Sequence, residues 1–181
     1  LIENKNAKFN IVHNLTEINI LKLVKDFLES FGELDSINFI HLASIVGESQ
    51  KNDWVTDIEE LGIKRSEDCY TISVTMPAKL ISIFTNFAYT KGVYINSIYG
   101  THPPDFSLYK NNPKLQNPIS YGSIKAAQIY SMHWLNNYFK TKLRLNALSP
   151  GGIESQNMDK EFKKLYLNKT LGSNFTSIAD I

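Results

Sequence analysis

The residue pair best suited to proton transfer in this sequence is Tyr121 and Lys125, four positions apart at the start of a predicted helix. That spacing puts both side chains on one helix face. A phenol titrates at about pH 10, and an ammonium group held beside it favours the phenolate. The pair could therefore act as a general acid and base on a substrate oxygen.

The spacing alone is not diagnostic, because Tyr138 and Lys142 repeat it. For that second pair, an exposed helix end is the better interpretation, since Lys140, Lys142 and Arg144 make it the densest basic cluster of the chain. The neighbours of Tyr121 are more informative. Ser97 lies near the end of an apolar run upstream, and the segment 150–153, Pro-Gly-Gly-Ile, follows an apolar run downstream.

Short apolar runs and helical patterns alternate along the chain. The pattern predicts strands at 9–13, 37–43, 93–98 and 143–148, with 37–43 buried on both faces. It predicts helices at 18–31, 70–90, 120–138 and 159–167; Gly32 ends the first and Gly92 the second, which runs through Pro77. The connection 44–68 is polar and irregular. This order indicates parallel βαβ units, which bind ligands at the carboxyl ends of their strands.

The segment 100–118 carries four of the six prolines and reads as a long loop. Loops of this length are usually functional or mobile. We expect it to be poorly packed and to lie over the cleft as a substrate lid.

Ser97, the Tyr121–Lys125 pair and the segment 146–151, Asn-x-x-x-Pro-Gly, resemble in order three motifs of the short-chain dehydrogenase/reductase family. The resemblance runs from about residue 9 to the C-terminus. It implies one Rossmann-like domain over 1–181, a doubly wound parallel sheet. The first two strands, the last strand and the Thr-Gly-x-x-x-Gly-x-Gly phosphate loop would be absent from this chain, as in an internal fragment, and 37–43 would present a bare apolar edge.

The resemblance also implies roles. Tyr121 would be the acid/base, Lys125 would lower its pKa and bind the nicotinamide ribose, and Ser97 would hydrogen-bond the substrate oxygen. Tyr99 would lie at the substrate with Ser97. Alternatively, Ser97 only caps a turn and 150–152 is a plain turn. The cofactor-binding positions implied are Asn14, Ala43, Lys125, Pro150, Gly151, Gly152 and Ile153.

Three departures from the family pattern bear on function. The fourth-strand motif Asn-Asn-Ala-Gly is replaced by 41–44, His-Leu-Ala-Ser, which resembles the nucleotide-sugar epimerase branch. The helix asparagine of the family's proton relay falls on Ser73. The insertion 101–119 resembles reductases of sugar and flagellin modification, and suggests a sugar derivative as substrate.

We therefore expect an NAD- or NADP-dependent oxidoreductase acting on a carbonyl/hydroxyl pair, a homo-oligomer when intact, with the chain alone inactive. The alternatives are a non-catalytic binding or scaffold module and a nucleotide-sugar epimerase or dehydratase. The formal net charge of +1 does not indicate a basic surface for nucleic acid, and no apolar run is long enough for a membrane span. No metal site is expected. The single cysteine, Cys69, favours a reducing compartment, which we take to be the cytoplasm.

Overall fold

The structure is a computed structural model that describes residues 2–4, 7–9, 19–44, 58–59, 62–111, 113, 116–155, 158–172 and 174–181. Its strands are β1 (Ile2–Asn4), β2 (Ala7–Phe9), β3 (Ser36–His41), β4 (Tyr89–Ile95) and β5 (Leu143–Leu148). Its longer helices are α1 (Asn19–Glu29), α2 (Ile63–Tyr70), α3 (Met76–Phe87), α4 (Ile119–Phe139) and α5 (Lys160–Lys169). The short helical turns are η2 (Thr71–Thr75), η3 (Ile98–Gly100), η4 (Phe106–Tyr109), η6 (Lys140–Lys142) and η7 (Ile178–Asp180).

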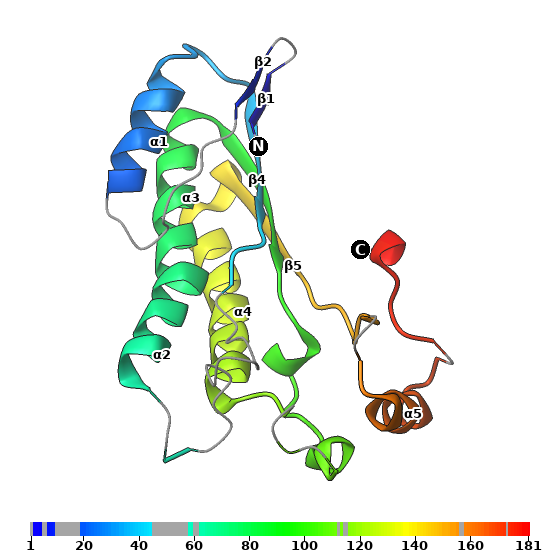
Figure 1. Ribbon diagram of the computed structural model, residues 1–181. Coiled ribbons are helices and arrows are strands. Elements are labelled where there is room, and N and C mark those ends of the chain that lie inside the picture. Colours follow the sequence, from blue (N-terminus) through cyan, green and yellow to red (C-terminus); the bar gives the residue numbers. More distant parts are fainter. Residues whose placement is uncertain are drawn as a thin grey trace.

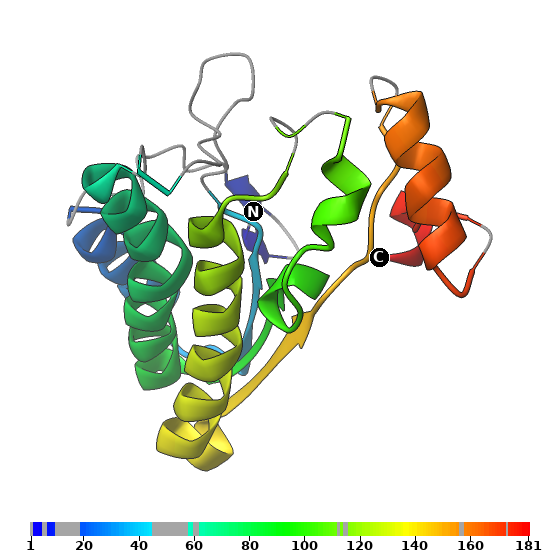
Figure 2. The ribbon, with the colours of Figure 1, turned by 90° about the horizontal axis from the view of Figure 1, so that it is seen from below.

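The central sheet has the strand order β3-β4-β5, with both neighbouring pairs parallel. The connections through α2–α3 and through α4 cross on one side, and α1, α3 and α4 lie side by side over that face (Figures 1 and 2). The predicted α/β class with parallel βαβ units is therefore confirmed. β1 and β2 form a separate antiparallel pair. The strand predicted at 9–13 overlaps β2 at Phe9, and residues 10–13 lie outside the described residues.

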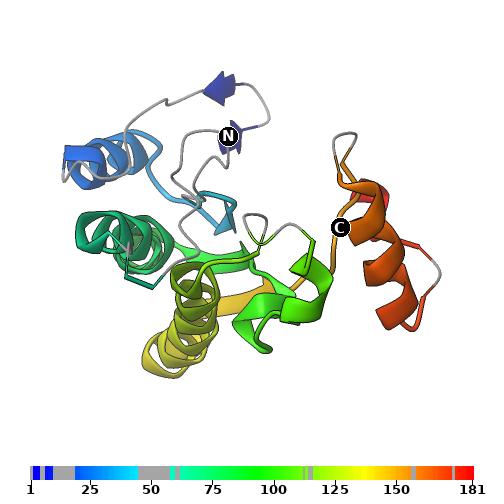
Figure 3. The same ribbon diagram turned by 60° about the horizontal axis from the view of Figure 1, so that its bottom comes forward.

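The prediction that the strand at 37–43 is buried on both faces is wrong. Alternate residues of β3 are exposed, among them Asn38 and Ile40, whereas His41 is buried. In the described part of the chain the helices cover only one face of this sheet, as Figure 3 shows. A strand covered on one side alternates between buried and exposed residues.

The helix predicted at 70–90 begins earlier and ends earlier. It starts at Ile63, passes through the π-helical turn η2 and ends at Phe87. Gly92 does not end this helix, because it lies within β4 between Phe39 and Leu145 of the flanking strands. A Cβ atom at Gly92 would stand 2.7 Å from Leu145 Cδ1, so close packing across the sheet accounts for this glycine.

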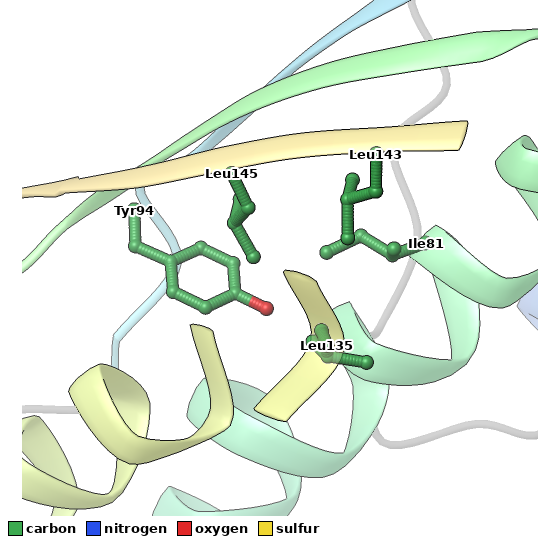
Figure 4. Close-up of a cluster of buried hydrophobic side chains, with 5 residues drawn as sticks. All are labelled: Ile81, Tyr94, Leu135, Leu143 and Leu145. Atoms are coloured by element: carbon green, nitrogen blue, oxygen red, sulfur yellow. The ribbon is translucent and has the colours of Figure 1, made fainter. Parts of the chain in front are cut away.

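The main core lies between the sheet and the helices α3 and α4. Five buried residues form it, and Tyr94 and Ile81 are fully buried. Figure 4 shows their side chains, with those of Leu135, Leu143 and Leu145, between the strands and the helices. Burial of these apolar surfaces fixes α4 against β4 and β5. None of the helices in the described ranges is both long enough and apolar enough to cross a membrane.

The segment 100–118 is better packed than predicted. Its helical turn η4 buries Leu108 and Tyr109 against Tyr166 of α5. Tyr109 packs on Phe162, Phe162 on Tyr166, and Tyr166 on Phe175, with ring centroids 4.8–5.8 Å apart. The expectation of a poorly packed loop is therefore wrong for η4, because the aromatic residues of α5 provide a second small core.

Candidate functional site

Lys125 lies at the carboxyl end of β4. Its side chain is buried, and its Nζ donates a hydrogen bond to the Ile95 carbonyl at 2.9 Å. The same nitrogen stands 5.8 Å from the ring centroid of Tyr121, one turn earlier on α4. Burial lowers the pKa of the Lys125 ammonium. The spacing of the Tyr-x-x-x-Lys pattern therefore produces a close pair where parallel sheets bind ligands.

Ser97 follows β4 and is buried. Its Oγ accepts a hydrogen bond from the Tyr99 backbone N–H at 3.2 Å, and so it caps the turn η3, the structural role that the sequence allowed for it. Accepting this bond does not use the hydroxyl hydrogen, because a serine hydroxyl can donate as well as accept. The Ser97 hydroxyl can still donate to a second oxygen.

The turn η3 packs closely against the start of α4. A Cβ atom at Gly122 would stand 3.1 Å from the Tyr99 carbonyl oxygen, and one at Gly100 would stand 3.0 Å from the Lys125 carbonyl. Side chains at these positions would separate the two elements. The glycines therefore let the segment after Ser97 lie directly on the segment that carries Tyr121 and Lys125.

A buried polar network supports this arrangement. Asn96 Nδ2 donates to the Lys125 carbonyl at 2.8 Å and to Gln128 Oε1 at 3.1 Å, while Asn96 Oδ1 accepts from the Ser97 N–H. Gln128 is fully buried and donates through Nε2 to the Ser73 carbonyl at 2.9 Å. The sequence interpretation missed Asn96 and Gln128. The position of Gln128, three residues after Lys125 on the buried helix face, is the signal that could have identified it.

The two glycines of the segment 150–153 lie close to Tyr166 of α5. Gly152 N–H donates to the Tyr166 hydroxyl at 2.6 Å, and a Cβ at Gly152 would stand 2.8 Å from Tyr166 Cζ. A Cβ at Gly151 would lie 3.3 Å from both the Tyr166 hydroxyl and Thr176 Oγ1. Ile153 forms a parallel bridge with Thr176. The glycines thus have a packing role that goes beyond a plain turn.

The segment after β4 contacts the segment after β5 directly at one backbone hydrogen bond, and it reaches α5 through Tyr109. The Ile98 N–H donates to the Pro150 carbonyl at 3.3 Å, and the hydroxyls of Tyr99 and Tyr109 lie 3.0 Å apart. Since Tyr109 also packs on Phe162, the Tyr99 side chain reaches the aromatic core of α5. Burial raises the pKa of Tyr99, so its hydroxyl stays protonated.

His41 is the last residue of β3 and pairs with Tyr94 of β4. It is 5% exposed, its Nε2 has no hydrogen-bond partner in the described part of the chain, and its ring packs edge-on against Tyr94. Burial, and then the charge of Lys125, lower the pKa of His41 to about 4. His41 is therefore neutral at pH 7. Ala43 follows it and is half-buried, while Asn14 lies outside the described residues.

The described residues contain no cluster of histidine, cysteine and acidic side chains that could hold a metal ion. Cys69 is buried, and burial raises the pKa of its thiol, which does not favour a nucleophilic role. The groups available for chemistry at the carboxyl end of β4 are thus a phenol, a buried ammonium and a hydroxyl.

No protein-family model and no curated protein matches the chain. Solved structures do share its fold. A short-chain dehydrogenase from Escherichia coli CFT073, complexed with NADPH, aligns with a TM-score of 0.56 at 19% identity, over 75% of this chain and 50% of that one. The enoyl-[acyl-carrier-protein] reductase (NADH) from Aquifex aeolicus VF5 gives 0.59 at 18% identity, over 85% of this chain and 56% of that one.

A third similar structure is the NADPH-dependent 3-quinuclidinone reductase from Rhodotorula rubra, with a TM-score of 0.63 at 13% identity. The alignment covers 91% of this chain and 58% of the reductase. These likenesses show that the sheet and helices are part of a Rossmann-like fold of the short-chain dehydrogenase type. The chain covers 50–58% of the length of these three proteins.

Proposed function

We propose that this chain carries the catalytic part of an NAD(P)-dependent oxidoreductase that interconverts a carbonyl and a hydroxyl group. The observation that carries the proposal is the placement of Lys125 Nζ, at the carboxyl end of β4 and 5.8 Å from the ring centroid of Tyr121. The fold likeness adds support, since the three similar proteins are reductases or dehydrogenases whose descriptions name NADPH or NADH.

The described residues fit the nicotinamide–ribose end of such a cofactor. An ammonium group has three N–H donors, and Lys125 gives one to Ile95. The remaining donors suit the ribose hydroxyls, while 150–153 and Ala43 would line the rest of this end. The sequence has no glycine-rich loop for the pyrophosphate, so the cofactor's phosphate end has no counterpart in this chain.

In this proposal Tyr121 gives a proton to the substrate oxygen in reduction and takes one in oxidation. The Lys125 ammonium lies beside the Tyr121 ring, with Nζ 5.8 Å from the ring centroid, and would bind the ribose of the cofactor. Ser97 donates its O–H to the same oxygen and so orients the substrate, and Tyr99 lies beside Ser97. The nicotinamide, when bound, supplies or accepts the hydride. The proposed substrate is a small molecule, and the long insertion suggests a sugar derivative. We propose that the intact protein is a homo-oligomer in the cytoplasm.

A second candidate function is a non-catalytic binding or scaffold module. It is favoured by the contacts of Ser97 and Gly152, since each already serves the fold through its bond to Tyr99 or Tyr166. The two proposals differ in what they expect of Tyr121. A catalytic chain loses turnover without its hydroxyl, whereas a scaffold has no turnover to lose.

The test supplies the absent phosphate loop. A chimera places the N-terminal βαβ unit of the Escherichia coli CFT073 dehydrogenase before Leu1, and NADPH oxidation is followed with a panel of aldehydes, ketones and keto-sugars. We expect turnover that falls at least a hundredfold in Tyr121→Phe, the low end for loss of general acid/base catalysis. Tyr138→Phe is the matched control, because it removes the hydroxyl of the other Tyr-x-x-x-Lys pair. Equal loss in both variants, or none in Tyr121→Phe, would contradict the proposed role.

A further inference from the structure

A pocket of about 550 Å³ opens on the side of α4 that faces away from Lys125. The helix contributes Ile119, Gly122, Ser123 and Ala126 to it, a spacing that forms a single stripe. The buried stripe of α4, with Ile124, Lys125, Gln128 and Leu135, lies on the other side of the helix. Tyr121 precedes Lys125 by one turn and shares its side. The pocket therefore includes none of Ser97, Tyr121 and Lys125, and it shares only Tyr99 with the residues that the proposed function places at the substrate.

The opposite wall of the pocket comes from the chain after Ser97. It consists of 99–104 and Phe106, together with 116–118, and Ile58 also lines the pocket. One apolar residue from each wall is largely exposed, Phe106 at 60% and Ile119 of α4 at 59%. The polar side chains in the wall are amides, hydroxyls and the imidazole of His102. Among the described residues that line the pocket, none is an aspartate, glutamate, lysine or arginine.

The volume and the lining define the ligand. Pockets of a few hundred cubic ångströms with apolar walls and a few polar groups typically bind small molecules. A charged ligand would lose water here without gaining an ion-pair partner. The start of α4 lies at the pocket and its dipole favours an anion, but at an exposed helix end this is a weak effect that does not replace a counter-charge. The observations favour an uncharged ligand.

We propose that this pocket is a second ligand site, which binds an uncharged small molecule with an apolar face and an amide or hydroxyl group. Asn117 provides a polar contact, because its Nδ2 donates to the Tyr109 hydroxyl and its Oδ1 remains an acceptor. The apolar face of the ligand lies against Phe106 and Ile119. The ligand also touches η3, whose Tyr99 N–H holds the Ser97 hydroxyl.

Two probes of equal size test the charge preference on the 181-residue chain. Naphthalene-2-carboxamide is neutral, and naphthalene-2-carboxylate is an anion at pH 7. Each is titrated into ¹⁵N-labelled protein. We expect saturable amide shifts at Gly100 and Gly122, which line the pocket, and none at Gly32 and Gly172, which do not. The carboxylate should bind at least tenfold more weakly.

Filling the pocket tests its location. Ala126→Trp should weaken carboxamide binding at least tenfold, whereas Asn137→Trp, at an exposed position of the same helix, should leave it unchanged. A Gly32 amide at its wild-type position shows that a variant is folded. If Ala126→Trp is not folded, Ser123→Trp takes its place. The proposal is overturned by absent shifts at Gly100 and Gly122, by equal binding of both probes, or by undiminished binding to the filled variant. None of these readouts depends on hydride transfer, so the proposed function stands or falls separately.

Discussion

The side-chain amide of Gln128 donates a hydrogen bond to the backbone carbonyl of Ser73, the residue four positions before Pro77. In an α-helix that carbonyl would accept from the N–H of residue 77, but proline has none. The Gln128 amide takes the place of the absent donor, at a carbonyl that lies within the π-helical turn η2. The same side chain accepts from Asn96, which also binds the Lys125 carbonyl. Gln128 thus joins the proline-containing helix to the segment that carries the proposed catalytic lysine.

Replacing Gln128 with leucine should lower the free energy of unfolding by about 1–3 kcal/mol, the cost of leaving a buried polar group without its partner. Urea denaturation measures it, with Asn137→Leu on the exposed face of α4 as the control. The loss should be smaller in a Pro77→Ala background, because residue 77 then has an N–H for the Ser73 carbonyl. An equal loss in both backgrounds would show that Gln128 does not compensate for Pro77.

Gly152→Ala should destabilise the docking of α5. The new methyl group would stand 2.8 Å from Tyr166 Cζ, and Tyr166 is held between Phe162 and Phe175. Overpacking of this kind costs about 1–3 kcal/mol. Gly172→Ala is the matched control, since no atom lies within 4 Å of a Cβ there. Hydrogen exchange of the α5 amides should accelerate in the first variant only; unchanged exchange would mean that Tyr166 moves aside without cost.

His41 should make stability depend on pH in the acid range. Its pKa is about 4 in the folded chain and about 6.5 when unfolded. As the pH falls from 6.5 towards 4, the unfolded chain takes up a proton that the folded chain does not. The contribution of His41 to the free energy of unfolding is therefore complete above pH 6.5. It declines as the pH falls, and about 3 kcal/mol of it is lost at pH 4.

Urea denaturation at pH 7, 6, 5 and 4 measures this dependence. His41→Phe keeps a ring against Tyr94 and should flatten the decline between pH 6.5 and 4. Carboxylates contribute to acid denaturation as well, so the comparison is between the slopes of the two proteins. An identical slope in the variant would rule out His41 as the source.

The order of β3, β4 and β5 and the spacing of the proposed catalytic residues could be predicted because they depend on local patterns, although β4 begins at Tyr89 and ends at Ile95 instead of spanning the predicted 93–98. β5 has the predicted bounds, and α4 differs from its prediction by one residue at each end. The Tyr121–Lys125 pair follows from helical spacing alone. Burial of 37–43 could not be judged from its composition, because an apolar run does not reveal how many faces of its strand are covered.

Contacts between distant segments were beyond the reach of the sequence. Nothing near Tyr109 indicates that it packs on Phe162, more than fifty residues later, so the sequence predicts an unpacked lid over 100–118. Glycine commonly ends helices, so the sequence predicts a helix end at Gly92. Its actual role depends on Leu145 across the sheet. In both cases the decisive neighbour is a tertiary contact.

The edge strand β3 should promote association. It pairs with β4 on one side only in the three-stranded sheet, and Ile40 and Leu42 are 66% and 71% exposed. Apolar edges invite pairing with another chain. Ile40→Lys should therefore shift the protein towards monomer in sedimentation velocity at micromolar to millimolar concentration. Ile178→Lys, at a residue 82% exposed outside the sheet, should not. Unchanged association of Ile40→Lys would place the contact elsewhere.

The 181-residue chain should not bind NADH or NADPH measurably and should show no hydride transfer. In the proposed function, Lys125 and the segment 150–153 contact the nicotinamide–ribose end, but the sequence has no glycine loop for the pyrophosphate. In Rossmann-like folds that loop and the following helix start hold the phosphates through backbone N–H groups. Titration of each nucleotide, followed by its fluorescence, measures binding. The chimera with an added βαβ unit is the positive control and should bind. Micromolar binding by the chain alone would show that another of its segments replaces the loop, and would refute this account of the cofactor site.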